Sequence, residues 1–184
     1  MRCGRDGSGE AGRRAVLVSD YWQQQRYDDA LYAQHSVLPG LTPARVLVTG
    51  SRHLTDAALV EDALAFAKAT FSPRPIVIVH GGAEGADELA HVLAPTFGMT
   101  RERWSADWKA PCRDNCKPGH RRFWRNGTDY CPAVGNYRNQ TMVDAGAELA
   151  LAFPVGDLVG TRDCMRRAEA AGIPVRIYER QASA

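Results

Sequence analysis

The chain has 184 residues, 45% of them hydrophobic, and a formal net charge of +2. This length fits one domain with a single core, and the composition excludes wholesale disorder and a strong overall attraction to nucleic acid. No apolar run approaches the roughly 18 residues that a membrane span needs, and the apolar stretch behind the N-terminal arginines is too short for a signal peptide. We therefore expect a cytoplasmic protein without a membrane partner.

The predicted elements alternate between strands and helices. Residues 1–43 are predicted to form a leader and an appendage, because they begin without periodicity and end in the linker-like PGLTP. In residues 44–184, continuous apolar runs predict buried strands at ARVLVTG, PIVIVHGG, ELALAFP and IPVRIYE, with a weaker strand in RERWSADW. Helical periodicity separates them, first behind an N-cap at Thr55 or Asp56. The expected fold is α/β, a Rossmann-like three-layer domain with a mostly parallel sheet of about five strands.

A glycine-rich turn, HGGAEGAD at residues 80–87, follows the second predicted strand. Ligands of such sheets bind at the carboxyl ends of the strands, and glycines allow the backbone to approach them. The N–H groups that open the next helix favour a phosphate, while Asp87 either complements the helix dipole or bonds a ribose hydroxyl. The alternative is close packing of the helix on the sheet. Neither the Walker pattern nor the dinucleotide fingerprint is matched.

Four ordered segments, VTGSR, VHGGAEGAD, GNYRNQTMV and GTRDCMRRAEAAGIPV, resemble the SLOG superfamily and in particular its YspA-like branch. The resemblance covers roughly residues 44–179. The first two segments are also similar to DprA, a single-stranded DNA binder, and the LOG phosphoribohydrolases are more distant relatives. The resemblance implies a pocket for a nucleotide or nucleotide-derived ligand, lined by Gly50, Ser51, Arg52, Gly81, Gly82, Ala83, Gly85, Asp87, Arg138, Asn139, Gly160 and Thr161.

Several of these residues also have a purely structural interpretation. Arg52 can pair with a phosphate beside the Ser51 hydroxyl, or be a surface arginine next to a turn serine. Thr161 is either an N-cap or a ligand contact. Arg138 and Asn139 share a helix face, on which Arg138 is either functional or simply solvated.

The resemblance leaves catalysis open, because the glutamate loop of the LOG enzymes is not intact here. Ala86 stands where that loop has threonine, and Glu88 is shifted. If the protein is an enzyme, we expect hydrolysis at a ribose or phosphate centre. Asp87 or Glu88 would then act as acid or base, and Arg52 or Arg138 would stabilise negative charge.

Residues 109–133 form a predicted insert that contains Cys112, Cys116, His120 and Cys131. Three thiolates and one imidazole make a complete tetrahedral ligand set, which predicts a structural zinc ion. Free buried thiols or a redox pair are the alternatives.

The same region is basic and aromatic. Residues 101–126 hold eight Lys or Arg residues against three acidic ones, interleaved with Trp104, Trp108, Phe123 and Trp124. These side chains either bind single-stranded nucleic acid or form the core and rim of a small zinc module.

The leading hypothesis for the function of the protein is a sensor or processor of a nucleotide-derived ligand. The alternatives are a DprA-like nucleic-acid binder, using the cluster from Arg121 to Arg125, and a zinc-dependent adaptor. The oligomeric state is left open, a homo-oligomer included.

Overall fold

The computed structural model of the chain describes residues 41–156 and 159–179. Nearly all of the predicted leader and appendage therefore lies outside the described residues. The remainder is built around one five-stranded sheet, whose strands are β1 (Ala44–Gly50), β2 (Ile76–His80), β3 (Thr100–Arg103), β6 (Leu149–Phe153) and β7 (Val175–Ile177). Their order is β3-β2-β1-β6-β7, and every pairing is parallel. The predicted fold class is confirmed, and the weak third strand is present but ends at Arg103, so the WSADW part of the predicted segment lies outside it.

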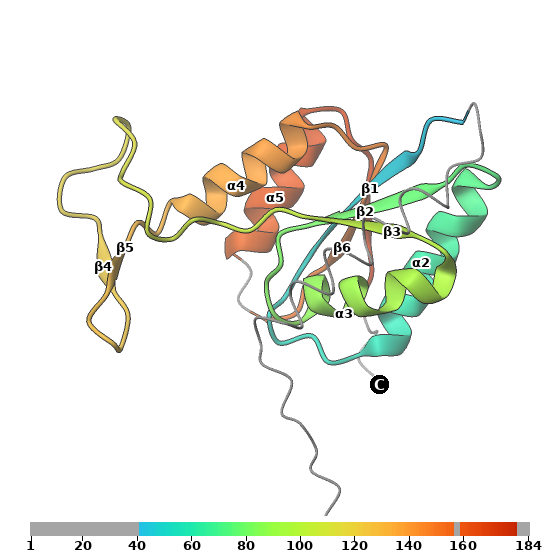
Figure 1. The fold of residues 1–184 in the computed structure, drawn as a ribbon, viewed down its shortest axis with the longest axis horizontal. Helices are drawn as coiled ribbons and strands as arrows, with labels where there is room; N and C mark the ends of the chain where they lie inside the picture. Colours follow the sequence, from blue (N-terminus) through green and yellow to red (C-terminus); the bar gives the residue numbers. More distant parts are fainter. Residues whose placement is uncertain (1–40, 157–158, 180–184) are drawn as a thin grey trace, which may run out of the picture.

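Helices cover both faces of this sheet, which makes the three layers visible in Figure 1. The helices are α2 (Ala57–Phe71), α3 (Ala86–Leu93), α4 (Val134–Asp144) and α5 (Val159–Ala170), and the 3-10 turn η1 (Ala94–Phe97) follows α3. Asp56 is the N-cap of α2, because its side chain accepts a hydrogen bond from the Leu59 N–H group.

Two apolar clusters lie on opposite faces of the sheet. Val46 and Val48 of β1 pack with the buried residues of α2 and α3, whereas Leu47 packs with those of α4 and α5. Successive side chains of a strand point to opposite faces, so a strand covered on both sides must be apolar throughout. This explains why the continuous run in β1 predicted its position well.

The direction in which successive strands are added to the sheet reverses at β1, which lies between β2 and β6. At this switch in strand order, Gly50 at the end of β1 is the register partner of Phe153 at the end of β6. A ligand crevice is expected outside the carboxyl ends of strands at such a point.

The connection between β3 and α4 carries only the short antiparallel hairpin of β4 (Arg122–Phe123) and β5 (Asp129–Tyr130). Figure 1 shows this segment projecting beyond the first turn of α4, away from the sheet. No helix in the described part of the chain is long and apolar enough to cross a membrane.

Candidate ligand cavity and metal cluster

Two buried side chains hold the glycine-rich turn from within. The Oδ2 atom of Asp87 accepts hydrogen bonds from the N–H groups of Gly81 (2.9 Å) and Ala83 (3.2 Å). The Gly82 N–H group donates to Nδ1 of His80 over 3.1 Å. Three consecutive backbone amides are therefore bonded to the protein itself, and the turn has a fixed shape without a ligand.

The Asp87 carboxyl group is 5% exposed. Burial raises its pKa to about 6, against the opposing effects of the Ala83 and Gly81 amides and of the nearby Arg138 guanidinium. At neutral pH most of this group is ionised, the form that accepts both hydrogen bonds. Asp87 thus shapes the turn, whereas Glu88 beside it lines neither of the two hollows described below.

His80, at the end of β2, forms a buried pair with His91 of α3. Its Nε2 atom lies 2.9 Å from Nδ1 of His91. Because Nδ1 of His80 accepts from Gly82, the neutral ring carries its proton on Nε2 and donates it to His91. Burial, followed by the charges of His91 and Arg103, lowers the pKa of His80 to about 3. The sequence analysis missed this pair, although a histidine ending an apolar strand just before a glycine was a usable signal.

Gly81 and Gly82 make room for two arginine side chains. A Cβ atom at residue 81 would lie 1.5 Å from Nη1 of Arg138, and one at residue 82 would lie 2.1 Å from Nε of Arg103. Arg138 donates to the Trp104 carbonyl oxygen (3.2 Å), and Arg103 donates to that of Gly82 (3.1 Å). The bare backbone of the turn is therefore approached by guanidinium groups.

Gly50 and Gly85 instead allow close packing within the protein. A Cβ atom at residue 50 would lie 2.5 Å from the Cβ atom of Ala86, and one at residue 85 would lie 2.3 Å from the Ser51 carbonyl oxygen. Gly85 also has a φ angle of 75°, which other residues rarely adopt. At Gly50 and Gly85 the contacts therefore match the alternative given in the sequence analysis, that the glycines allow close packing of the helix on the sheet.

A cavity of about 310 Å³ opens at the carboxyl ends of the strands, beside the switch in strand order. Nine of the twelve expected ligand residues line it, namely Gly50, Ser51, Arg52, Ala83, Asp87, Arg138, Asn139, Gly160 and Thr161. Gly81 and Gly82 line an adjoining hollow, and Gly85 lines neither. Lining residues that the sequence analysis did not expect at this site are Thr49, His53, Trp108, Pro132, Gly135, Asn136 and Val159.

The walls of this cavity favour an anion. Residues in the first turns of α3, α4 and α5 line it, so the positive ends of three helix dipoles meet there. Burial lowers the pKa of Arg138, while the Asp87 carboxylate raises it. Within residues 41–156 and 159–179, neither Arg52 nor Arg138 forms an ion pair with a carboxylate. Both guanidinium charges are available to a ligand.

Asn139 fixes the cavity wall. Its Nδ2 atom donates to the Gly160 carbonyl oxygen and to the Asp163 carboxylate, each over 3.2 Å. Its Oδ1 atom accepts from Nε of Arg138 at 3.1 Å. Asn139 is 4% exposed, so it joins α4 to α5 and orients Arg138 from within the protein.

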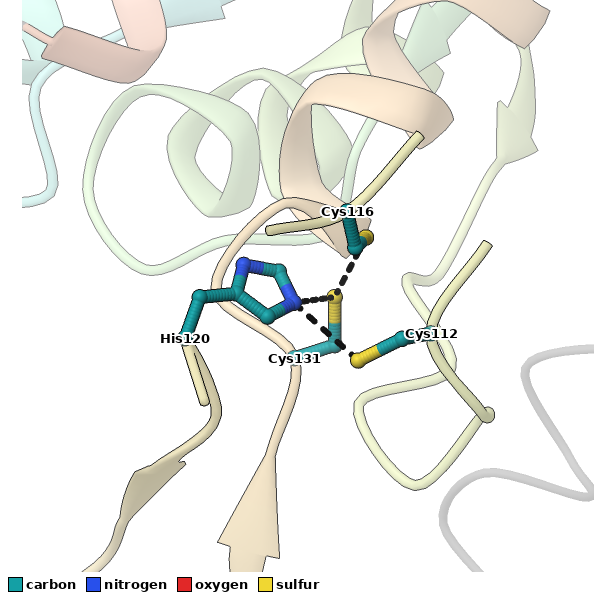
Figure 2. Close-up of side chains that lie close together, drawn as sticks. All are labelled: Cys112, Cys116, His120 and Cys131. Atoms are coloured by element: carbon teal, nitrogen blue, oxygen red, sulfur yellow. Dashed lines mark hydrogen bonds between the residues drawn. The ribbon is translucent and has the colours of Figure 1, made fainter. Parts of the chain in front are cut away.

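The predicted metal ligands come together, as Figure 2 shows. Their ligand atoms all lie within 4.8 Å of one another, with Nε2 of His120 3.0 Å from Sγ of Cys112 and 3.4 Å from Sγ of Cys131. The Cys116 and Cys131 sulfur atoms are 3.8 Å apart. Metal–sulfur bonds of about 2.3 Å in a tetrahedron place sulfur atoms about 3.8 Å apart, whereas a disulfide needs about 2.05 Å. These four residues could hold a metal ion.

The metal cluster is continuous with the cavity wall. Cys131 directly precedes Pro132, which lines the cavity, and the chain then enters α4. The Sγ atom of Cys116 lies 3.0 Å from the Tyr137 hydroxyl oxygen of α4. Arg121 donates to the Cys112 sulfur atom at 3.7 Å and forms an ion pair with Asp129, so it supports the insert.

The aromatic residues of the insert pack on one another. Trp124 is stacked on Tyr130 with ring centroids 4.2 Å apart, and Trp108 meets Trp124 edge to face at 6.2 Å. A module this short needs such packing for its own stability. Trp108 also lines the cavity, so the same ring serves the insert and the site.

Fold and site together define a Rossmann-like domain with a glycine-rich turn beside a cavity at the switch point of its sheet. Residues 44–110 match the sequence profile of the YspA, cpYpsA-related SLOG family. The chain is also 43% identical over 136 residues to the Gene 61 protein of Mycobacterium phage D29, an alignment that covers 71% of this chain and 93% of that protein. The chain belongs to the YspA, cpYpsA-related SLOG family, as its motifs predicted.

Proposed function

We propose that the protein binds a nucleotide or nucleotide-derived ligand in the 310 Å³ cavity. Membership of the SLOG family supports this class of ligand. The observation that carries the proposal is the convergence of Arg52, Arg138 and three helix N-termini on one cavity at the switch point. Phosphate oxygens accept hydrogen bonds from guanidinium groups and from helix N-termini more strongly than neutral acceptors do.

The ligand phosphate lies against Arg52 and Arg138 in this proposal. The amides of Gly81, Gly82 and Ala83 do not receive it, because Asp87 and His80 already accept from them. Trp108 supplies an indole ring on the cavity wall, where a base can pack. The proposal concerns binding, and Asp87 and Asn139 contribute to it by holding the turn and Arg138 in place.

We further propose that Cys112, Cys116, His120 and Cys131 hold a zinc ion with a structural role. Three thiolates and one imidazole suit zinc, and four protein ligands leave no open position for catalysis. The ion adds to the stability that the packed aromatic rings give this short segment.

Native mass spectrometry of the protein purified from cells tests both proposals in one spectrum. We expect one zinc ion per chain and a retained nucleotide mass that disappears in an Arg52→Ala variant. An Arg122→Ala variant is the matched control, because Arg122 is an exposed arginine that lines neither hollow. Absence of both a retained mass and any binding of added nucleotides would overturn the ligand proposal, and a chain without metal would overturn the zinc proposal.

A second candidate function is binding of single-stranded nucleic acid at the β4–β5 hairpin. The observation that favours it is the exposure of Phe123 (73%) and Trp124 (43%) between Arg122 and Arg125. Exposed rings can stack with bases, and arginines neutralise phosphates. Binding of an oligonucleotide would then weaken steeply with salt and fall in an Arg122→Gln, Arg125→Gln variant. Binding that ignores salt and these changes would reject this candidate.

A further inference from the structure

A second hollow, of about 460 Å³, adjoins the ligand cavity. The two share Arg52, Ala83, Trp108 and Arg138 in their walls, so one ligand can extend from one into the other. The second hollow is also lined by Gly81, Gly82, Glu84, Arg103, Ser105, Ala106 and Trp124. We call it the three-arginine recess, after Arg52, Arg103 and Arg138.

The charge of this recess is strongly one-sided. Three arginines and a single carboxylate, that of Glu84, line it. Like charges in one concave site repel one another, and a concave wall with little water strengthens this repulsion. In the described residues no carboxylate forms an ion pair with Arg52 or Arg138, although the buried Asp87 carboxylate attracts Arg138 and Arg103 electrostatically.

The backbone places two of these guanidinium groups against the glycine-rich turn. Arg138 lies over Gly81 and is held by the Trp104 carbonyl oxygen and by Asn139. Arg103, at the end of β3, lies over Gly82 and donates to its carbonyl oxygen at 3.1 Å. Any side chain at residue 81 or 82 would displace the group above it. Arg138 is therefore held on two sides, whereas Arg103 is an exposed side chain that lies over the turn with one hydrogen bond to it.

We propose that the three-arginine recess binds a second phosphoryl group of the ligand, so that the ligand is a nucleotide with at least two phosphoryl groups. Arg52 and Arg138 lie between the two hollows and contact both phosphoryl groups, while Arg103 contacts only the second. This inference rests on the proposed function for the nature of the ligand. Independently of that function, it requires that the recess bind an anion and that this binding depend on Arg103.

The test compares ribonucleoside 5′-monophosphates with the corresponding 5′-diphosphates by isothermal titration calorimetry. We expect each diphosphate that binds to bind about tenfold more tightly than its monophosphate, as one additional charge-assisted contact provides. In Arg103→Gln this preference disappears while monophosphate affinity stays the same, and Arg103→Lys restores part of it. Arg122→Gln, which removes an exposed charge outside both hollows, retains the full preference.

Equal affinity for mono- and diphosphates in the wild type, or an unchanged preference in Arg103→Gln, would overturn the inference and leave the proposed function intact. If no nucleotide binds, the proposed function fails, and inorganic pyrophosphate then tests the recess alone. Pyrophosphate binding that is lost in Arg103→Gln but kept in Arg122→Gln supports the recess. No pyrophosphate binding overturns it. Far-ultraviolet circular dichroism of each variant establishes that it is folded.

Discussion

The guanidinium group of Arg138 occupies the space that a side chain at residue 81 would take. Gly81 is not among the glycines with a positive φ angle, so its backbone does not exclude alanine, and the three atoms nearest to an added Cβ all belong to Arg138. Arg138 is in turn oriented by Asn139, which is buried between α4 and α5. Gly81 and Asn139 thus decide where the Arg138 guanidinium group lies.

We therefore predict that Gly81→Ala lowers nucleotide affinity about tenfold, because one guanidinium contact is displaced, and lowers stability by about 1–2 kcal/mol. Calorimetry and urea unfolding measure the two effects. In an Arg138→Ala background, Gly81→Ala should change affinity little, since the group that it displaces is already absent. Additive losses in the double variant would show that Gly81 acts by another route.

The buried His80 ring makes stability depend on pH. Its pKa is about 3 in the folded protein, below the ordinary value of 6.5, so the unfolded chain binds more protons between these values. The contribution of His80 to stability is complete above pH 6.5 and is lost as the pH falls toward 3. Between pH 7 and pH 5 the free energy of unfolding should decrease by about 2 kcal/mol from this group.

Urea unfolding of the wild type and of His80→Asn at both pH values measures this effect. Asparagine retains an acceptor for the Gly82 amide but does not titrate. Asp87 is present in both proteins, and its raised pKa acts in the opposite direction, so the difference between the two proteins isolates the histidine. Equal pH dependence of the two proteins would contradict the prediction, as would a His80 ring that titrates near pH 6.5 by NMR.

Among the elements, α4 is the helix whose N-terminal end is attached to the metal cluster, that is, to Cys112, Cys116, His120 and Cys131. Its first turn has no side-chain cap, and the preceding residues run from Cys131 through the cavity-lining Pro132. Tyr137, in the next turn, contacts the Cys116 sulfur atom. The helix that carries Arg138 is thereby attached to the insert at two points.

We predict that loss of the metal weakens ligand binding although no metal ligand lines the cavity. Cys131→Ser, or prolonged treatment with EDTA, should lower nucleotide affinity at least tenfold and expose residues 104–133 to proteases. Binding assays, inductively coupled plasma mass spectrometry and limited proteolysis measure the three quantities. Cys164→Ala is the control, because this buried α5 residue lies outside the cluster and should leave the metal content unchanged. Full affinity in metal-free protein would refute the coupling.

For the molecule as a whole, the cavity draws its walls from the end of β1, from the glycine-rich turn after β2 and from three helices. A ligand that binds only the folded state adds about 2.7 kcal/mol of stability at a concentration of 100 times its Kd. For a chain of this size we predict a rise in Tm of roughly 5–10 °C. Differential scanning fluorimetry measures it, and Arg52→Ala should keep the Tm of the free protein but show little rise.

Much of this architecture could be predicted from local sequence patterns. Apolar runs predicted the strands, and the spacing of three cysteines and a histidine predicted the metal cluster, because both signals lie within short segments. Contacts between distant segments could not be predicted in this way. Nothing near Gly82 in the sequence indicates Arg103 above it, and nothing near His80 requires His91 as its partner. The motifs indicated a phosphate-binding turn but not that its amides are already bonded.

That internal bonding of Gly81, Gly82 and Ala83 has a kinetic consequence. A turn that already has its final conformation loses little entropy when a ligand arrives, so preorganisation reduces the free energy that binding must offset. Association should then proceed in one fast step, without the slower phase that closure of a loop would add. The half-life of the complex would be set by how quickly the arginine side chains release the phosphates.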